Sequence, residues 1–148
     1  SLPYILLLSS LWLLSCGKDD PEKIARKDRE KILEYIAEHN LDAQEHESGL
    51  FYVMEQEGSG AHPTATSTVS IKYEGYLLNG KVFDFRFTPV SIYLGNTIQG
   101  WRIGIPLFKR GSKGMLLIPS GLGYGPYAQP DIPPNSVLIF EIELIDFS

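Results

Sequence analysis

From residue 50 onward, this chain of 148 residues is a succession of short strand-like segments, and only one segment among them has helical spacing. Alternation of apolar and polar residues places Val69, Ile71 and Tyr73 on one face of a strand. In the last segment, apolar residues at the even positions from 138 to 144 share a face, with Glu141 and Glu143 on the other. The predicted strands cover residues 50–54, 69–73, 76–78, 81–83, 90–94, 115–118 and 138–144.

The connections between these segments set the fold class. The pair Asn79-Gly80 predicts a tight hairpin, in which we expect a positive φ at both turn positions. The single helical segment has Ile98, Trp101 and Ile105 on one face, and Pro106 is expected to close it. These elements predict an α+β fold, an antiparallel sheet with one short α-helix on one face.

A second helix is predicted ahead of the strands, over residues 21–40. Asp20 can act as its N-cap, and a proline follows at the first helical position. Ile24, Ile32 and Ile36 form a narrow apolar stripe, and charged residues cover the other faces. We expect this helical extension to be a spacer from a membrane, or a small packing or dimerisation element.

The first residues have the pattern of an export signal. Residues 2–14 are almost wholly apolar, but the run is shorter than the ~20 residues that cross a bilayer, as is typical of a secretory signal. Leu13-Leu14-Ser15-Cys16 resembles the lipobox of bacterial lipoproteins. That resemblance implies a signal peptide that is removed and a lipid on Cys16. It also implies a place in the bacterial cell envelope, on the periplasmic side of the outer membrane or on the cell surface.

The leader has no initial Met and no basic residues ahead of the apolar run, so we expect that its own beginning is missing. Asp19 and Asp20 after the cysteine are typical of a solvated linker, and a signal for export to the cell surface is the alternative. The predicted division of the chain is a signal peptide at 1–15, a lipidated cysteine and linker at 16–20, a helical extension and linker at 21–48, and the main domain at 49–148.

Composition and spacing exclude several function classes. A net charge of −5 and the lack of a Lys/Arg stripe argue against nucleic acid as a partner. His39, His46 and His62 lack metal-ligand spacing, so we expect neither a metal nor a cofactor. The glycine-rich run at 121–125 is followed by prolines rather than a helix, which excludes a phosphate-binding loop. No Ser/His/Asp or Cys/His set predicts nucleophilic catalysis.

Aromatic residues are the remaining candidates for a site. Tyr73, Phe83, Trp101, Tyr124 and Phe140 fall on different strands, the single helix and a proline-rich loop. On spacing alone, they are explained most simply as core residues, because aromatic side chains dominate core burial. A shared pocket is the alternative that spacing leaves open.

The strings around these aromatic residues, taken in order, closely resemble the FK506-binding-protein family of peptidyl-prolyl cis–trans isomerases. The resemblance covers roughly the last two-thirds of the chain and implies a curled antiparallel β-sheet wrapped around one short α-helix. The strings that carry it are Val69-Ser-Ile-Lys-Tyr73-Glu-Gly75, Asn79-Gly-Lys-Val-Phe83-Asp84, Ile98-Gln-Gly100-Trp101, Lys113-Gly-Met-Leu-Leu-Ile-Pro119, Tyr124-Gly125 and Ile132-Pro133-Pro134-Asn135-Ser-Val-Leu-Ile-Phe140.

The resemblance also implies the site residues. Trp101 is expected to form the pocket floor, Tyr124 to hold a substrate carbonyl, and Phe140 to hold the proline ring. Asp84 is expected at the polar edge, where it either orients Tyr73 or biases the twisted amide electrostatically. The implied catalytic residues are Asp84, Tyr124, Phe140 and Trp101, and the implied substrate-binding residues are Tyr73, Phe83, Val90, Ile98 and Ile132.

The chain departs from the family pattern in two loops. The segment 85–89 is about three residues short, the second arginine of the family has no clear counterpart there other than Arg86, and Val90 stands where many members have Phe. The loop from Tyr124 is also short and carries Asp131 in place of an apolar residue. These differences bear on the affinity for FK506 and rapamycin-type ligands and on catalytic strength more than on the fold.

Two functions are compatible with these residues. The first is an isomerase that assists the folding of exported proteins and takes proline-containing polypeptides as clients. The second is a non-catalytic chaperone or peptide-binding module of the same fold on a lipoprotein anchor. We expect a monomer, with a dimer through Ile24, Ile32 and Ile36 as the alternative.

Overall fold

The computed structural model describes residues 20–148, so the leader and Cys16 lie outside the described part of the chain. Six antiparallel strands form one sheet in the order β1-β2-β5-β6-β3-β4. The strands are β1 (Gln44–Glu45), β2 (Phe51–Gln56), β3 (Thr68–Leu77), β4 (Val82–Tyr93), β5 (Lys113–Ile118) and β6 (Leu138–Phe147). The helices are α1 (Pro21–Glu38) and α2 (Gln99–Gly104), with 3-10 turns η1 (Leu94–Asn96), η2 (Ile105–Leu107) and η3 (Ser120–Leu122).

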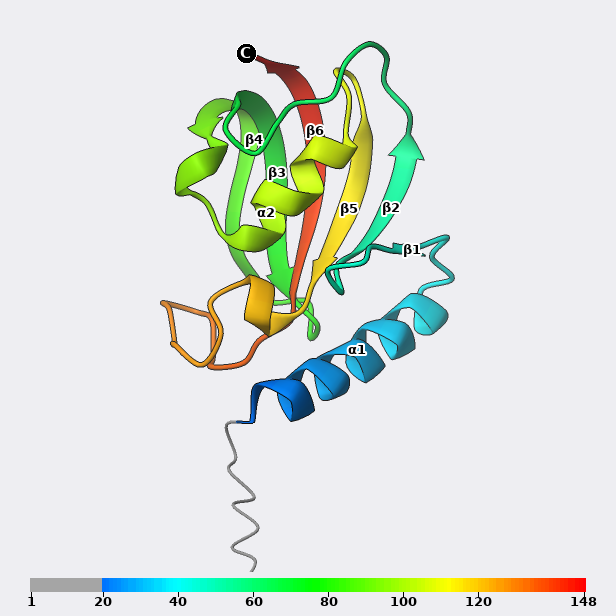
Figure 1. Ribbon diagram of the computed structural model, residues 1–148, viewed down its shortest axis with the longest axis vertical. Coiled ribbons are helices and arrows are strands. Elements are labelled where there is room, and N and C mark those ends of the chain that lie inside the picture. Colours follow the sequence, from blue (N-terminus) through cyan, green and yellow to red (C-terminus); the bar gives the residue numbers. More distant parts are fainter. Residues whose placement is uncertain (1–19) are drawn as a thin grey trace, which may run out of the picture.

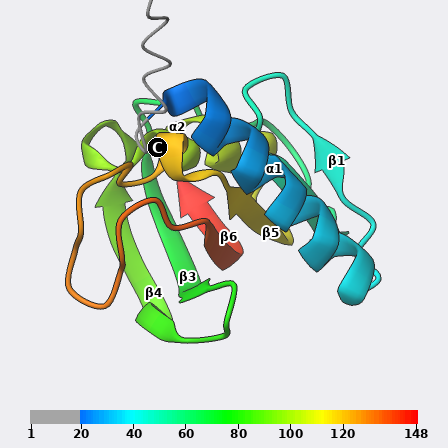
Figure 2. The same ribbon diagram turned by 90° about the horizontal axis from the view of Figure 1, so that it is seen from below.

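The two helices lie on different sides of the sheet. Figure 1 shows the sheet curling around α2, and α1 crossing beneath it; Figure 2 shows α1 passing β5 and β6. Side chains of β5 alternate accordingly: Leu116 and Ile118 join the core on the α2 side, while Met115 and Leu117 join a second cluster with Ile32 of α1. This burial on both faces explains the unbroken apolar run of β5. The predicted α+β fold is confirmed.

Helix α1 is held at both its start and its middle. Asp20 caps it, because the Asp20 side chain accepts a hydrogen bond of 3.0 Å from the Glu22 backbone N–H. Ile32 is fully buried against the sheet, whereas Ile24 and Ile36 are partly buried. The extension therefore packs on its own domain, as one of the sequence-based alternatives predicted. A dimer through Ile32 would first require α1 to leave the sheet.

Truncating Ile32 to alanine is expected to lower the free energy of unfolding by about 2–5 kcal/mol, because it removes a fully buried side chain and leaves a cavity. Urea denaturation followed by Trp fluorescence measures this loss. Leu33→Ala on the neighbouring, exposed position is the control and should change stability by less than about 1 kcal/mol. Equal effects of the two substitutions would contradict the observed docking of α1.

Two local predictions need correction. The segments 69–73 and 76–78, apart from Leu78, belong to one strand, β3. The segments 81–83 and 90–94, apart from Lys81 and Leu94, belong to one strand, β4. The register of β4 against β3 shifts between the pairs Ile71↔Val90 and Tyr73↔Arg86. Pro89 is tolerated there because β4 is an edge strand of the sheet. In the hairpin, only Gly80 has a positive φ (87°), and its N–H donates to the Leu77 carbonyl at 2.9 Å. A longer turn that ends in a left-handed glycine replaces the predicted two-residue turn.

The single helix among the strands is shorter than predicted, and a 3-10 turn follows it. Helix α2 ends at Gly104, and Pro106 lies inside the 3-10 turn η2 that follows instead of closing the helix. Segment 40–48, predicted as a linker, contains the short strand β1, which pairs with β2. No helix within residues 20–148 is both long enough and apolar enough to span a membrane.

Candidate functional site

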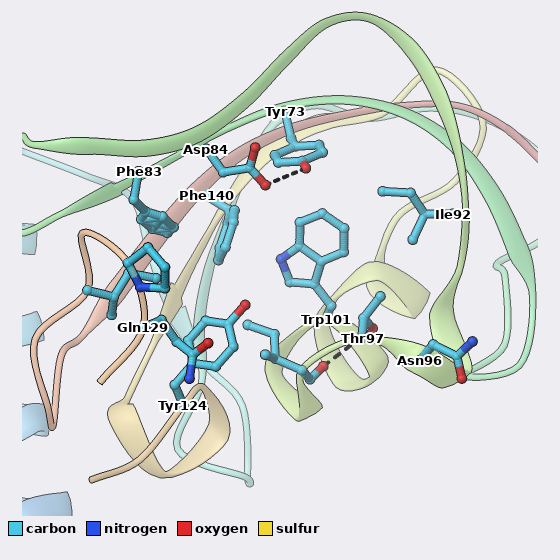
Figure 3. Close-up of a pocket in the computed structure, with 13 residues that line it drawn as sticks. Tyr73, Phe83, Asp84, Ile92, Asn96, Thr97, Trp101, Tyr124, Gln129 and Phe140 are labelled. Carbon is cyan, nitrogen blue, oxygen red and sulfur yellow. Dashed lines mark hydrogen bonds between the residues drawn. The ribbon is translucent and has the colours of Figure 1, made fainter. Parts of the chain in front are cut away.

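A pocket of about 580 Å³ opens between the curled sheet, α2 and the loop that precedes β6 (Figure 3). Its floor is Trp101 of α2, which is 5% exposed. The Trp101 ring meets Tyr73 edge-on with a centroid separation of 4.9 Å and Phe140 with a separation of 5.1 Å. Edge-to-face contacts of this kind fix ring orientation, so the floor is a rigid apolar surface.

The indole nitrogen of Trp101 adds one polar group to this floor. Among the described residues, Trp101 Nε1 is a buried donor with no hydrogen-bond partner. Figure 3 shows the indole ring beside the space between Phe140 and Tyr124. An unpaired buried donor carries a free-energy cost, and because this N–H is itself buried, an acceptor on a bound molecule would reach it only after neighbouring side chains shift.

Phe140 of β6 connects the floor to the wall formed by β4. Its ring lies 5.5 Å from that of Phe83 at 80° and 6.2 Å from that of Tyr73 at 60°. Gly75 pairs with Phe140 across β3 and β6. A Cβ atom at Gly75 would lie 2.7 Å from ring atoms of both Phe83 and Phe140, so the absence of a side chain lets these rings approach the strand.

Asp84 forms the polar edge of the pocket. The Tyr73 hydroxyl donates to Asp84 Oδ2 at 2.7 Å, and Arg86 Nη1 donates to Asp84 Oδ1 at 3.1 Å. Burial and the neighbouring carboxylate raise the pKa of Tyr73, so this tyrosine stays protonated and remains a donor. The predicted contact between Asp84 and Tyr73 is present, and Arg86 occupies the second oxygen.

Tyr124 approaches from the opposite side on the loop after η3. Its side chain is 39% exposed, and Figure 3 shows its hydroxyl directed into the pocket. Ile132 closes the same loop, held by backbone bonds in both directions with Gln129. Asp131 lies at the loop tip with a φ of 64° and pairs with Lys81 at 3.2 Å, so it forms no part of the lining.

The structure brings together every predicted site residue of the domain except one. Val90 packs against the core and does not line the pocket, whereas Ile92 does. Both lie on one face of β4 in an unbroken register, opposite Ile71 and Val69, so their positions along the strand, and not the register shift, separate them. The lining residues that the sequence did not single out are Ile92, Asn96, Thr97, Gln129 and Pro130. Of these, only Ile92 could have been predicted from the sequence, because it lies two residues from Val90 and therefore on the same face of the strand.

The part of the chain that the structure describes contains no set of metal ligands. Within residues 20–148, no three His, Cys, Asp or Glu side chains come close enough to hold an ion. The only carboxylate in the pocket lining, Asp84, is already bonded to Tyr73 and Arg86. What the arrangement can do is bind an apolar ring on Trp101, with hydrogen-bonding groups around it.

Comparison with known proteins matches this geometry. The model of the FKBP-type peptidyl-prolyl cis-trans isomerase family matches residues 59–145. A probable FKBP-type isomerase of Haemophilus influenzae is 40% identical over 140 residues, which are 90% of this chain and 58% of that protein. FkpA of Escherichia coli is 42% identical over 102 residues, or 67% of this chain and 38% of FkpA. The chain thus spans about two-fifths to three-fifths of these relatives.

Solved structures give the same result. A peptidyl-prolyl cis-trans isomerase from Pseudomonas syringae superposes with a TM-score of 0.76 at 33% identity, covering 89% of this chain and 99% of that one. The crystal structure of Escherichia coli FkpA superposes with a TM-score of 0.73 at 37% identity, covering 86% of this chain and 62% of FkpA. Both structural matches cover more of the chain than residues 59–145, the range that the family model matches.

Proposed function

Since the chain belongs to the FKBP-type peptidyl-prolyl cis-trans isomerase family, we propose that its aromatic pocket catalyses the cis–trans isomerisation of Xaa–Pro bonds in polypeptides. The observation that carries this proposal is the rigid apolar floor of Trp101 and Phe140 facing Tyr124, with Asp84 at its edge. The enclosed space accepts a proline ring, and the groups around it reach the flanking amide.

The reaction needs a group that stabilises a twisted amide, and neither a nucleophile nor a metal. Amide resonance imposes a rotation barrier of ~18–20 kcal/mol, and water bound to the carbonyl oxygen favours the planar, resonant form. The rings of Phe83, Trp101 and Phe140 exclude that water. The pocket then binds the twisted amide better than the planar one, which lowers the barrier.

The polar groups hold the substrate at the edges of this apolar surface. The Tyr124 hydroxyl donates to a substrate carbonyl, and the position of Asp84 near the mouth favours a partial positive charge on the rotating amide. Because Tyr73 and Arg86 hold both Asp84 oxygens, the carboxylate needs little reorganisation as the bond rotates.

A protease-coupled assay on a Xaa–Pro peptide tests this proposal. Asp84→Val is expected to lower kcat/KM by roughly tenfold, because it removes the charge and leaves the Tyr73 hydroxyl and Arg86 without their partner. Asp84→Asn separates the two roles of this residue, since the amide can accept from Tyr73 but carries no charge. Activity retained in Asp84→Asn assigns an orienting role, and activity lost assigns an electrostatic one.

A second candidate function has one observation in its favour. Phe85 and Phe87, 51% and 65% exposed, stack on the edge strand that also carries Phe83, with their ring centroids 4.8 Å apart. Exposed aromatic pairs are typical of interaction surfaces, so the same domain could act as a non-catalytic peptide-binding module. A wild-type protein that binds a proline-containing peptide without accelerating its isomerisation would establish this alternative.

We further propose that Cys16 carries a lipid and that the domain works in the bacterial cell envelope on exported polypeptides. The apolar run at 2–14 and the string Leu13-Leu14-Ser15-Cys16 support this proposal. Metabolic labelling with a fatty acid, comparing the wild type with Cys16→Ser, tests it. Label in the wild type alone is the expected result, and equal labelling of both proteins would refute the anchor.

A further inference from the structure

A buried carboxylate connects the N-terminal helix to the loop of the pocket. Asp28 of α1 and Ser120, the first residue of η3, are each 1% exposed and lie 92 residues apart in the chain. Asp28 Oδ2 accepts from the Ser120 N–H at 2.8 Å and from the Ser120 hydroxyl at 2.5 Å. A carboxylate is rarely buried without partners, and hydrogen bonds to an ionised acceptor are among the strong ones.

The other side of Ser120 holds the turn that carries Tyr124. The Ser120 carbonyl accepts from the Gly123 N–H at 3.0 Å and from the Gly125 N–H at 2.9 Å. These two glycines are the immediate neighbours of Tyr124 in the chain. An unbroken series of hydrogen bonds therefore runs from α1 through Ser120 to both sides of the residue that faces the substrate.

Side chains of residues 20–148 do not completely fill the space between α1 and this loop. A second pocket of about 330 Å³ lies there, lined by Ile24 and Ala25 of α1 and by Leu122 and Pro126 of the loop, among others. Figure 1 shows the start of α1 below the gold segment that contains η3. On this side the loop is not closely packed on α1, and the bonds from Asp28 to Ser120 are the directional contact between them.

We propose that Asp28 is a positioning residue for Tyr124, and that α1 thereby forms part of the functional unit of the isomerase. The catalytic consequence of this positioning rests on the proposed function, whereas the structural coupling of α1 to the turn that carries Tyr124 does not. Loss of Asp28 leaves two buried donors of Ser120 without an acceptor, and the turn from Ser120 to Gly125 loses its attachment to α1.

Amide hydrogen exchange measured by NMR tests the coupling without any assay of activity. In Asp28→Ala, the protection of the Gly123 and Gly125 amides is expected to fall by about tenfold or more relative to that of the β6 amides. In Asp28→Asn, the amide oxygen can accept both bonds from Ser120, so protection should return close to the wild-type value. Phe108→Ala is the matched control, because it removes a fully buried side chain from the core on the α2 side and leaves α1, Asp28 and Ser120 in place.

Unchanged protection in Asp28→Ala, or an equal loss in Phe108→Ala, would overturn the proposal. Ser120→Ala provides a second route if Asp28→Ala does not fold. It removes one of the two bonds, so a smaller loss of protection at the same two glycines is expected, and no loss again contradicts the coupling.

Kinetics complete the test. On a Xaa–Pro peptide, Asp28→Ala is expected to lower kcat/KM by about fivefold or more at a temperature where it is fully folded, with Asp28→Asn near the wild type. A wild-type protein without isomerase activity would count against the proposed function, while hydrogen exchange would still decide the coupling. Lost protection with unchanged kcat/KM would refute the positioning role.

Discussion

Replacing Phe140 with alanine is expected to lower kcat/KM for a Xaa–Pro peptide by between about tenfold and a hundredfold. Fully burying an apolar side chain is worth about 1.5–3 kcal/mol, and each 1.36 kcal/mol corresponds to a factor of ten in rate. Phe140 contacts Phe83, Tyr73 and Trp101, so its loss also frees the orientation of the remaining rings. The free energy of unfolding should fall by about 3–5 kcal/mol.

Phe108 supplies the matched control for this experiment. It is fully buried in the same core cluster as Phe140 but does not line the pocket. Phe108→Ala is expected to lose a similar free energy of unfolding and to keep its kcat/KM per folded molecule. If either alanine variant is unfolded at the assay temperature, Phe140→Leu and Phe108→Leu give the same comparison. Equal activity losses in both positions would mean that the Phe140 ring has no role beyond packing.

The substitution Gly75→Ala, which adds one methyl group on β3, is expected to distort the pocket through the rings of Phe83 and Phe140. Because the new Cβ would lie 2.7 Å from the rings of Phe83 and Phe140, these rings must move into the cavity or the strand must shift. Overpacking of this kind costs about 1–3 kcal/mol of stability. We expect kcat/KM of Gly75→Ala to fall by about tenfold or more, with misplacement of the two rings as the physical reason.

Leu117→Val separates this effect from loss of stability alone. Leu117 is fully buried on the side of the sheet that faces α1, away from the pocket. Its truncation should lower the midpoint of urea denaturation to a comparable degree while leaving kcat/KM unchanged. A Gly75→Ala variant with wild-type kcat/KM would show that the pocket tolerates displaced rings, and the account of Gly75 given above would be wrong.

Local patterns in the sequence predicted most of the elements correctly. The alternation of Val69, Ile71 and Tyr73 and the N-cap at Asp20 depend on neighbours within one strand or one helical turn. Patterns of this range survive in the tertiary structure, because the strand alternation offers an apolar face to be buried and the N-cap satisfies a free backbone N–H of the first helical turn. The ordered aromatic strings extended the prediction to the pocket, since they reproduce a known arrangement over the whole domain.

The errors lie where geometry over several strands decides the outcome. Val90 and Ile92 have the same local pattern and the same register against β3, but only Ile92 lies at the point along the curled strand that reaches the pocket. The hairpin at Gly80 has a longer turn than its two residues suggested, and register shifts between strands accompany it. Neither the number of residues in a bulge nor the curl of a sheet is encoded in an alternating pattern.

The sequence by itself determined that this domain is a strand-rich sheet on one short helix, with an aromatic set able to form a pocket. Only the tertiary structure decided that α1 docks on the same domain through Ile32 and that Asp28 reaches Ser120. The reason is the range of the interactions. Periodicity and capping act between residues a few positions apart, whereas the partner of a buried carboxylate is chosen by which distant segments the folded chain brings together.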